Sequence, residues 1–248
     1  MKNNNKKVKI YRRLLKYSPF YARRRAGIMR IIHNLRCGQI ESIAPEQVSV
    51  NDAEKLYTAI YLANQTQNVE CRGEQAIFTV AIKDIKKMCN IKNEKYISDS
   101  IRRIAQITIN YYFANKQVKT FHIIDKSDFD PASGYLSVKM PIETFQAFSE
   151  KGLQININTF INIKPTSKNL YGYLVSNSSC RFLEELLIER TGIDCNRKNN
   201  AKNFLKNALD ELKKNHIIKT YKIEKKDGQR YINIEKIGGN ELTTTVVK

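Results

Sequence analysis

The spacing of apolar residues between positions 181 and 214 predicts two consecutive helices. In the first helix the apolar positions recur at three- and four-residue intervals, and Gly192 can end it. These positions are Phe182, Leu183, Leu186 and Leu187. A second helix over 199–214 has one apolar face, on which we expect Phe204, Leu205, Ala208, Leu209 and Leu212 to be buried. If Phe204 is a core residue, its replacement by alanine should cost about 3–5 kcal/mol.

The other face of the second helix and the segment after it are polar and basic. That outer face carries amides and ammonium groups, from Asn199, Asn200, Asn203, Lys206 and Asn207. From 218 to 236 apolar and polar residues alternate on both sides of Asp227-Gly228, which predicts a β-hairpin with a tight turn. Basic residues gather toward its tip, namely Lys222, Lys225, Lys226 and Arg230.

Helix, turn, helix and basic hairpin together predict a winged helix. In such a unit the second helix enters the major groove of DNA and the hairpin lies on the phosphates. Asparagine can pair with adenine edges, and lysine neutralises phosphate charge. The alternative is a solvated helix-hairpin unit with ordinary surface lysines, but the acid-poor face and the charge of the whole chain favour DNA binding.

The same order of elements is predicted earlier in the chain, without a letter-by-letter repeat. A helix capped by Asn51 or Asp52 is followed by a strand at 77–80 and a helix at 82–90. A further helix carries Ile97, Ile101 and Ile104, and we expect its outer side to hold Lys95, Ser98, Arg102 and Arg103. Paired strands at 107–113 and 118–124 complete the unit.

We therefore predict an α+β protein with two tandem winged-helix domains. The expected division is a basic N-terminal arm at 1–50, a first domain at 51–152, a second at 153–237 and a tail at 238–248. Within these we expect a short basic helix at 28–35 ended by Gly38, a loop containing Asp128 and Asp130, and a strand at 135–140. Helices at 141–148 and 165–175 and a strand at 156–163 are also expected.

Composition and charge point to a polyanionic partner. The 248 residues are 42% hydrophobic, so the chain can form real cores, and its formal charge is +19 with a pI near 9.7. The excess of basic residues is concentrated before residue 53 and after residue 152. Nucleic acid is the first candidate partner, although the basic, aromatic stretch at 1–27 could lie along phosphates or along a membrane surface.

Other classes of protein find little support in the sequence. Because no apolar run approaches membrane-spanning length and the start lacks the apolar core of a signal peptide, we expect a cytoplasmic protein without membrane contact. The five cysteines form no C-x-x-C pair and the three histidines lie far apart, so we expect no metal site and no cofactor.

Two long segments, taken with the order of elements, resemble plasmid replication initiators of the iteron-binding class. They are KNLYGYLVSNSSCRFLEELLIERTGI and NNAKNFLKNALDELKKNHIIKTYKIEKKDGQRYINI. Earlier stretches resemble the first winged helix of the same family, in particular its TrfA-like branch; these are DAEKLYTAIYLANQ, IFTVAIKDIKKMCNI, SDSIRRIAQITINYYF and GYLSVKMPIETFQAFSEKG. The resemblance covers about residues 50–236 and has no counterpart for the arm before them.

The resemblance implies a protein that binds direct repeats in a plasmid origin, helps to open adjacent duplex, and recruits a host initiator and helicase. In this family the second winged helix supplies the principal major-groove contacts, and the first supplies supporting contacts and dimerisation. Carried onto this chain, it implies base contacts from Asn199, Asn200, Asn203, Lys206 and Asn207, hairpin contacts from Lys222, Lys225, Lys226 and Arg230, and supporting contacts from Lys95, Ser98 and Arg102. No catalytic residue is implied.

The alternatives comprise several enzyme classes and one further class of DNA-binding protein. A rolling-circle initiator would need a His-x-His metal pair beside a nucleophile such as Tyr111 or Tyr112, and the chain has no such pair. It also lacks the G-x-x-x-x-G-K-[ST] phosphate loop of an ATP-driven initiator, and a magnesium nuclease built on Asp125, Asp128 and Asp130 is less favoured than a solvated turn. A winged-helix transcriptional repressor stays open, and a footprint on one palindrome would favour it.

Overall fold

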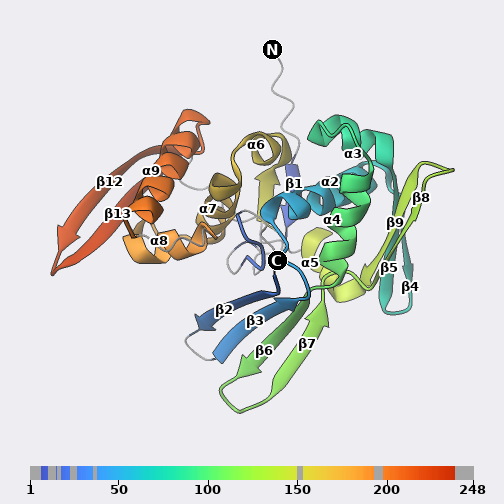
Figure 1. Ribbon diagram of the computed structural model, residues 1–248, viewed down its shortest axis with the longest axis horizontal. Helices are drawn as coiled ribbons and strands as arrows, with labels where there is room; N and C mark the ends of the chain where they lie inside the picture. Colours follow the sequence, from blue (N-terminus) through green and yellow to red (C-terminus); the bar gives the residue numbers. More distant parts are fainter. Residues whose placement is uncertain are drawn as a thin grey trace, which may run out of the picture.

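The structure is a computed structural model that describes residues 7–10, 15, 18–22, 27–35, 38–149, 153–192 and 198–237. Eight helices and four antiparallel sheets are found in these residues, so the chain is a mixed α and β protein. Figure 1 shows two groups of helices side by side, each flanked by strands, with a further sheet projecting below them. No helix in the described part of the chain is both long and apolar enough to span a bilayer.

The N-terminal half is built around α2 (Val50–Thr66). The helix begins at Ser49, whose backbone N–H and hydroxyl both donate to the Asp52 carboxylate at 2.8 Å. Asn51 and Asp52 were the predicted caps, so the helix starts slightly earlier than expected. Asp52 lies in the first turn and accepts the hydrogen bonds that cap the helix. Its inner face is fully buried and comprises Ala53, Leu56, Ala59, Ile60 and Ala63. Against it pack α3 (Ile82–Cys89) and α4 (Lys95–Ala105), two helices that the sequence predicts.

A four-stranded sheet lies on the outer side of this helical group. Its order is β4 (Val69–Arg72), β5 (Gln75–Ala81), β9 (Tyr135–Pro141) and β8 (Lys126–Asp130), and α5 (Ile142–Ser149) follows β9. Strands β5 and β9 and helix α5 were predicted. The loop expected around Asp128 and Asp130 is wrong, because both residues lie in β8 and pair with Ser137 and Tyr135 of β9.

A second four-stranded sheet corrects the prediction for residues 28–35. These form β2 (Met29–Leu35) and not a helix, in a sheet ordered β2, β3 (Gly38–Ala44), β6 (Thr108–Phe113) and β7 (Val118–His122). Burial alternates along β2, since Met29, Ile31 and His33 are buried or half-buried while Arg30, Ile32 and Asn34 are exposed, which is strand periodicity. Gly38 is required at the turn, since its φ is +148° and a Cβ would come within 2.1 Å of the Tyr112 carbonyl oxygen.

The segment joining the halves also differs from expectation. Residues 153–156 form β10 (Leu153–Asn156), which pairs with β1 (Lys7–Ile10), and α6 (Ile157–Asn162) replaces most of the strand predicted at 156–163. The Asn156 side chain accepts a hydrogen bond from the Thr159 backbone N–H at 3.0 Å, so this asparagine caps a helix. Residues 1–50, expected as an arm, thus contribute β1, β2 and β3.

The C-terminal half has the predicted order of helices and hairpin. It comprises α7 (Pro165–Ser176), β11 (Arg181–Leu183), α8 (Glu184–Arg190), α9 (Lys198–Lys214), β12 (Ile218–Lys226) and β13 (Gln229–Lys236). One correction concerns Phe182 and Leu183, which were assigned to the first helix but lie in β11. There Phe182 pairs with Ile232 of β13, so β11 adds a third strand to the hairpin.

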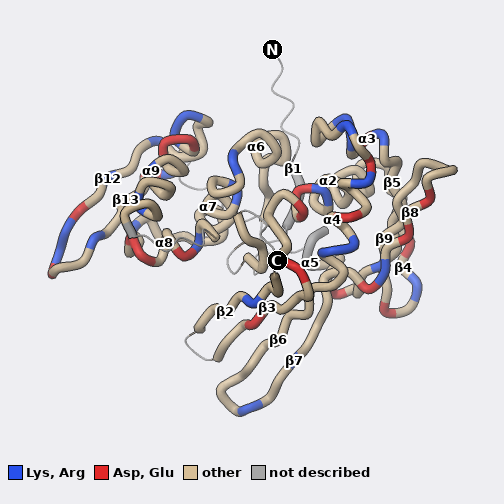
Figure 2. Tube along the Cα trace, viewed as in Figure 1, with Lys and Arg blue, Asp and Glu red and all other residues tan. Residues whose placement is uncertain are grey.

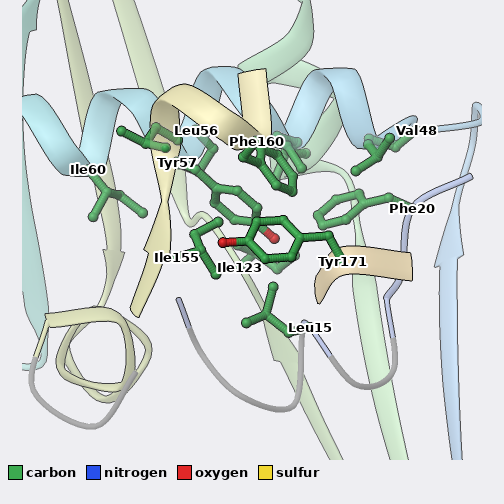
Figure 3. Packing of buried hydrophobic residues seen from close by; sticks show 14 of the residues in the cluster. Leu15, Phe20, Val48, Leu56, Tyr57, Ile60, Ile123, Ile155, Phe160 and Tyr171 are labelled. Atoms are coloured by element: carbon green, nitrogen blue, oxygen red, sulfur yellow. The ribbon is translucent and has the colours of Figure 1, made fainter. Parts of the chain in front are cut away.

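One continuous core joins the two halves. Figure 3 shows Leu15, Phe20, Tyr57, Phe160 and Tyr171 converging in it. The rings of Tyr57 and Phe160 have centroids 5.6 Å apart, which links α2 to α6. A buried ion pair between Lys168 of α7 and Glu54 of α2 crosses the same junction. The packing of the halves therefore combines apolar burial with paired charges.

Candidate nucleic-acid interface

Helix α9 presents the polar face that the sequence predicts. Its inward residues are at most 5% exposed, and they are Ala201, Leu205, Ala208, Leu209 and Leu212. The opposite residues are exposed and are termed the amide face: Asn199, Asn200, Asn203, Lys206 and Asn207. Asp210, seven residues after Asn203, lies on the same side, so the face offers amide donors and acceptors together with positive charge and ends in one carboxylate.

Phe204 is not the core residue that the apolar pattern suggested. It is 39% exposed, whereas the adjacent Leu205 is 2% exposed. Neighbouring residues on a helix point about 100° apart, and the buried stripe of α9, although wide enough to hold both Ala208 and Leu209, does not extend to Phe204. The stripe packed against the rest of the half runs through Ala201, Leu205 and Leu212, and Phe204 lies at its border.

The hairpin β12–β13 carries exposed lysines toward its tip and extends away from the helices. Lys222, Lys225 and Lys226 are exposed, and Figure 2 shows basic residues along β12 to its end. The turn forms as predicted, with Asp227 and Gly228 at φ values of 50° and 75°. These ammonium groups are separated from the core and available to a polyanion.

Arg230, also predicted to contact DNA, forms an ion pair inside the protein, and its side chain is 45% exposed. Its Nε lies 2.9 Å from Oε2 of Glu184, whose side chain is only 5% exposed. Lys202 of α9 approaches the same oxygen at 3.8 Å. Glu184 therefore joins α8, α9 and the hairpin through two cations. This role of Glu184 could not be predicted from the sequence because Glu184 and Arg230 are far apart along the chain.

A second contact fixes the base of the hairpin against α9. The Tyr221 hydroxyl donates to the Asp210 carboxylate at 2.8 Å. Burial, together with this acceptor, raises the pKa of Tyr221 to about 12, so the hydroxyl keeps its proton at neutral pH. This hydrogen bond fixes the position of the hairpin relative to the amide face of α9.

In the N-terminal half, the residues predicted on the outer side of α4 differ in their surroundings. Lys95 is exposed, Ser98 is half-buried and donates to the Lys95 carbonyl oxygen at 3.1 Å, and exposed Arg102 lies 3.1 Å from Glu46. The assignment of Arg103 to the outer side is wrong. Arg103 is 7% exposed, and its Nη2 lies 2.5 Å from Oδ1 of Asp52.

The Arg103 pair explains why this arginine turns inward. Asp52 accepts further hydrogen bonds from Ser49 and from Ser100. Burial acts to raise the pKa of Asp52, but the hydrogen bonds from Arg103, Ser49 and Ser100 outweigh it and the pKa lies below its ordinary value. Arg103 therefore stabilises the packing of α4 on α2 and is not available to DNA.

Additional lysines surround the turn between α3 and α4. Lys83, Lys87 and Lys92 are exposed, as is Lys95 at the start of α4. Figure 2 shows this basic region on the opposite side of the molecule from the β12–β13 hairpin. Of these four lysines, only Lys95 was predicted from the sequence to contact DNA. Counting lysines on both sides of the turn would have identified the rest.

The tyrosines and aspartates considered for a nicking enzyme or a nuclease lie in strands and turns of the fold. Tyr111 and Tyr112 lie in β6, where the Tyr112 hydroxyl donates to Glu41 at 2.7 Å. Asp130 accepts from the Ala132 backbone N–H at 2.9 Å in the turn after β8. Within the described ranges no three His, Cys, Asp or Glu side chains lie together as metal ligands would.

Comparison with known proteins gives a structural relationship only. No family model matches the chain, and no curated protein sequence matches it. Solved structures of domains 2 and 3 of RctB are similar over 91% of this chain and 98% of theirs, with a TM-score of 0.63 and 12% sequence identity. A second structure, RctB residues 155–483, gives a TM-score of 0.57 at 12% identity, with 91% and 97% covered. The similarity establishes a shared fold across both halves.

Proposed function

We propose that this protein is a replication initiator that binds direct repeats in a plasmid origin. The observation that carries the proposal is the amide face of α9 beside a hairpin with exposed lysines toward its tip. Amides can bond base edges in the major groove, and lysines can neutralise phosphates. The fold shared with domains 2 and 3 of RctB, a replication initiator, supports the same role.

In this proposal each half is a winged helix. The C-terminal unit comprises α7, β11, α8, α9 and the β12–β13 hairpin, and α9 enters the major groove. The N-terminal unit comprises α2, α3, α4 and the β6–β7 hairpin, and the lysines around the α3–α4 turn make supporting phosphate contacts. As in the initiators that the sequence resembles, the first unit also serves dimerisation.

The proposed activity is binding without catalysis. Occupied repeats promote opening of the adjacent duplex, and a host initiator and helicase are then recruited. The protein is proposed to act in the cytoplasm without a cofactor. Residues of the amide face distinguish base sequences, whereas Lys222, Lys225 and Lys226 contribute affinity that does not depend on sequence.

Footprinting the full-length protein on the DNA that flanks its own gene tests the proposal. An initiator should protect several direct repeats at regular spacing. Protection of one palindrome would favour the alternative, a transcriptional repressor, and absence of any footprint at low salt would contradict DNA binding as a whole.

A further inference from the structure

Phe204 is an exposed aromatic residue within the proposed recognition surface. Among the described residues of α9, 198–214, it is the one large apolar side chain with a third or more of its surface exposed, at 39%. Water contact with a phenyl ring is unfavourable, so this position contributes less to folding than a buried phenylalanine would. The exposed part of the ring is available for an apolar contact with a binding partner.

The position of Phe204 on α9 brings it beside asparagines. Asn200 precedes it by four residues and Asn207 follows it by three, and such residues are neighbours on a helix surface. The contacts that hold the hairpin are made by other residues of α9. Asp210, seven residues after Asn203 and on the same face, accepts a hydrogen bond from Tyr221, and Lys202 pairs with Glu184 on the flank away from Phe204. Phe204 takes part in neither contact.

The combination of asparagine and phenylalanine matches the chemistry of one kind of base pair. In the major groove an adenine offers N7 and N6 to a bidentate amide, and the thymine paired with it exposes a C5 methyl group. A guanine–cytosine pair offers no such methyl. A helix that carries both amides and an apolar ring can thus contact both bases of adenine–thymine pairs.

We propose that α9 recognises adenine–thymine pairs and that Phe204 is a specificity-determining residue whose ring contacts a thymine methyl group. This inference rests on the proposed DNA-binding function and adds to it a preferred base composition. The asparagines supply hydrogen bonds to adenine, and Phe204 supplies an apolar contact that depends on one methyl group.

The test begins with duplexes selected by the wild-type protein from a random 20-base-pair library. Each thymine of a selected duplex is replaced in turn by deoxyuridine, which removes only the C5 methyl, and affinity is measured by fluorescence anisotropy. At one or two positions the wild type should bind about fourfold more weakly, the equivalent of one buried methyl group. Phe204→Ala should bind the thymine duplex more weakly by a similar factor and lose nothing further on the deoxyuridine duplex.

Two variants serve as controls. Phe204→Leu keeps an apolar side chain and should retain part of the thymine preference. Tyr135→Ala removes an aromatic residue that is 48% exposed on β9, away from α9, and should behave as the wild type.

Two results would overturn the inference. Equal wild-type affinity for thymine and deoxyuridine at every position would do so, as would an undiminished difference in Phe204→Ala. Both are distinct from failure to select any duplex, which would reject the proposed function itself.

Discussion

Replacement of Glu54 by glutamine should destabilise the protein strongly, because it breaks a buried ion pair between the halves. Lys168 of α7 and Glu54 of α2 have side chains 4% and 6% exposed. Lys168 also donates to Asn51 Oδ1 at 3.1 Å, and Lys55 lies 3.5 Å from the other Glu54 oxygen. Glutamine keeps the shape of glutamate, so the change removes mainly the charge that balances the Lys168 ammonium.

The expected loss of free energy of unfolding is about 3–5 kcal/mol, the usual cost of leaving one charge of a buried pair uncompensated. Because domains are stable by only about 5–15 kcal/mol, this is a large fraction of the total. Urea unfolding followed by circular dichroism measures it. Adding Lys168→Met to Glu54→Gln should recover much of the loss, since the Lys168 ammonium is then no longer buried without its carboxylate.

Glu70→Gln provides a matched control for this prediction. Glu70 pairs with Arg72 at 2.6 Å, but the two side chains are 63% and 73% exposed. Such a surface pair contributes at most about 1 kcal/mol. If Glu54→Gln costs no more than Glu70→Gln, or if the double variant is no more stable than the single one, the account of the junction is wrong.

Three further predictions concern the hairpin and pH. Lys225→Ala with Lys226→Ala should weaken binding equally on all sequences and reduce the salt slope by about 1.8, at about 0.9 per phosphate contact; an unchanged slope would count against hairpin contacts. Arg230→Ala should instead lower the unfolding midpoint, because it leaves Glu184 with the more distant Lys202, and normal stability with a reduced slope would show that Arg230 binds phosphate. Burial and the neighbouring Arg190 lower the pKa of His33, so the unfolded state takes up the proton first and stability should fall as pH drops below about 6.5; His33→Gln should flatten that dependence in urea titrations between pH 7 and 5.5, and an equally steep fall would exclude His33 as its source.

The electrostatic surroundings of His33 involve both halves of the molecule. Its Nδ1 bonds with Arg190 and lies 3.5 Å from Glu189 of α8, and its Nε2 lies 3.3 Å from the Ser18 carbonyl oxygen. Glu189 favours the protonated ring, but burial and Arg190 outweigh it. Protonation would therefore place a positive charge beside Arg190 at the junction.

Elements with local signals were predictable from the sequence. Helix α9 and the β12–β13 hairpin follow from helical spacing, alternation and the Asp227-Gly228 turn, all within one short stretch. Strand β2 was mistaken for a helix because isoleucines at 28, 31 and 32 also fit helical spacing. Its strand state depends on pairing with β3, which in turn pairs with β6 about seventy residues away.

The candidate site was predictable in composition but not in its contacts. The exposure of Asn203 and Lys206 follows from helix periodicity alone. That Arg230 is held by Glu184 and that Arg103 turns inward to Asp52 depends on partners distant in the chain. The exposure of Phe204 depends on how wide a stripe of α9 is covered, which periodicity does not specify.

The central claim is that the amide face of α9 distinguishes base sequences, and Asn203→Ala tests it most directly. Affinity is measured by fluorescence anisotropy on a duplex selected by the wild type and on a random duplex at the same salt concentration. Asn64→Ala, at an exposed position in the last part of α2, is the matched control. The account predicts a loss of about 1–3 kcal/mol on the selected duplex and almost none on the random one. Equal losses on both duplexes, or no loss on either, would contradict it.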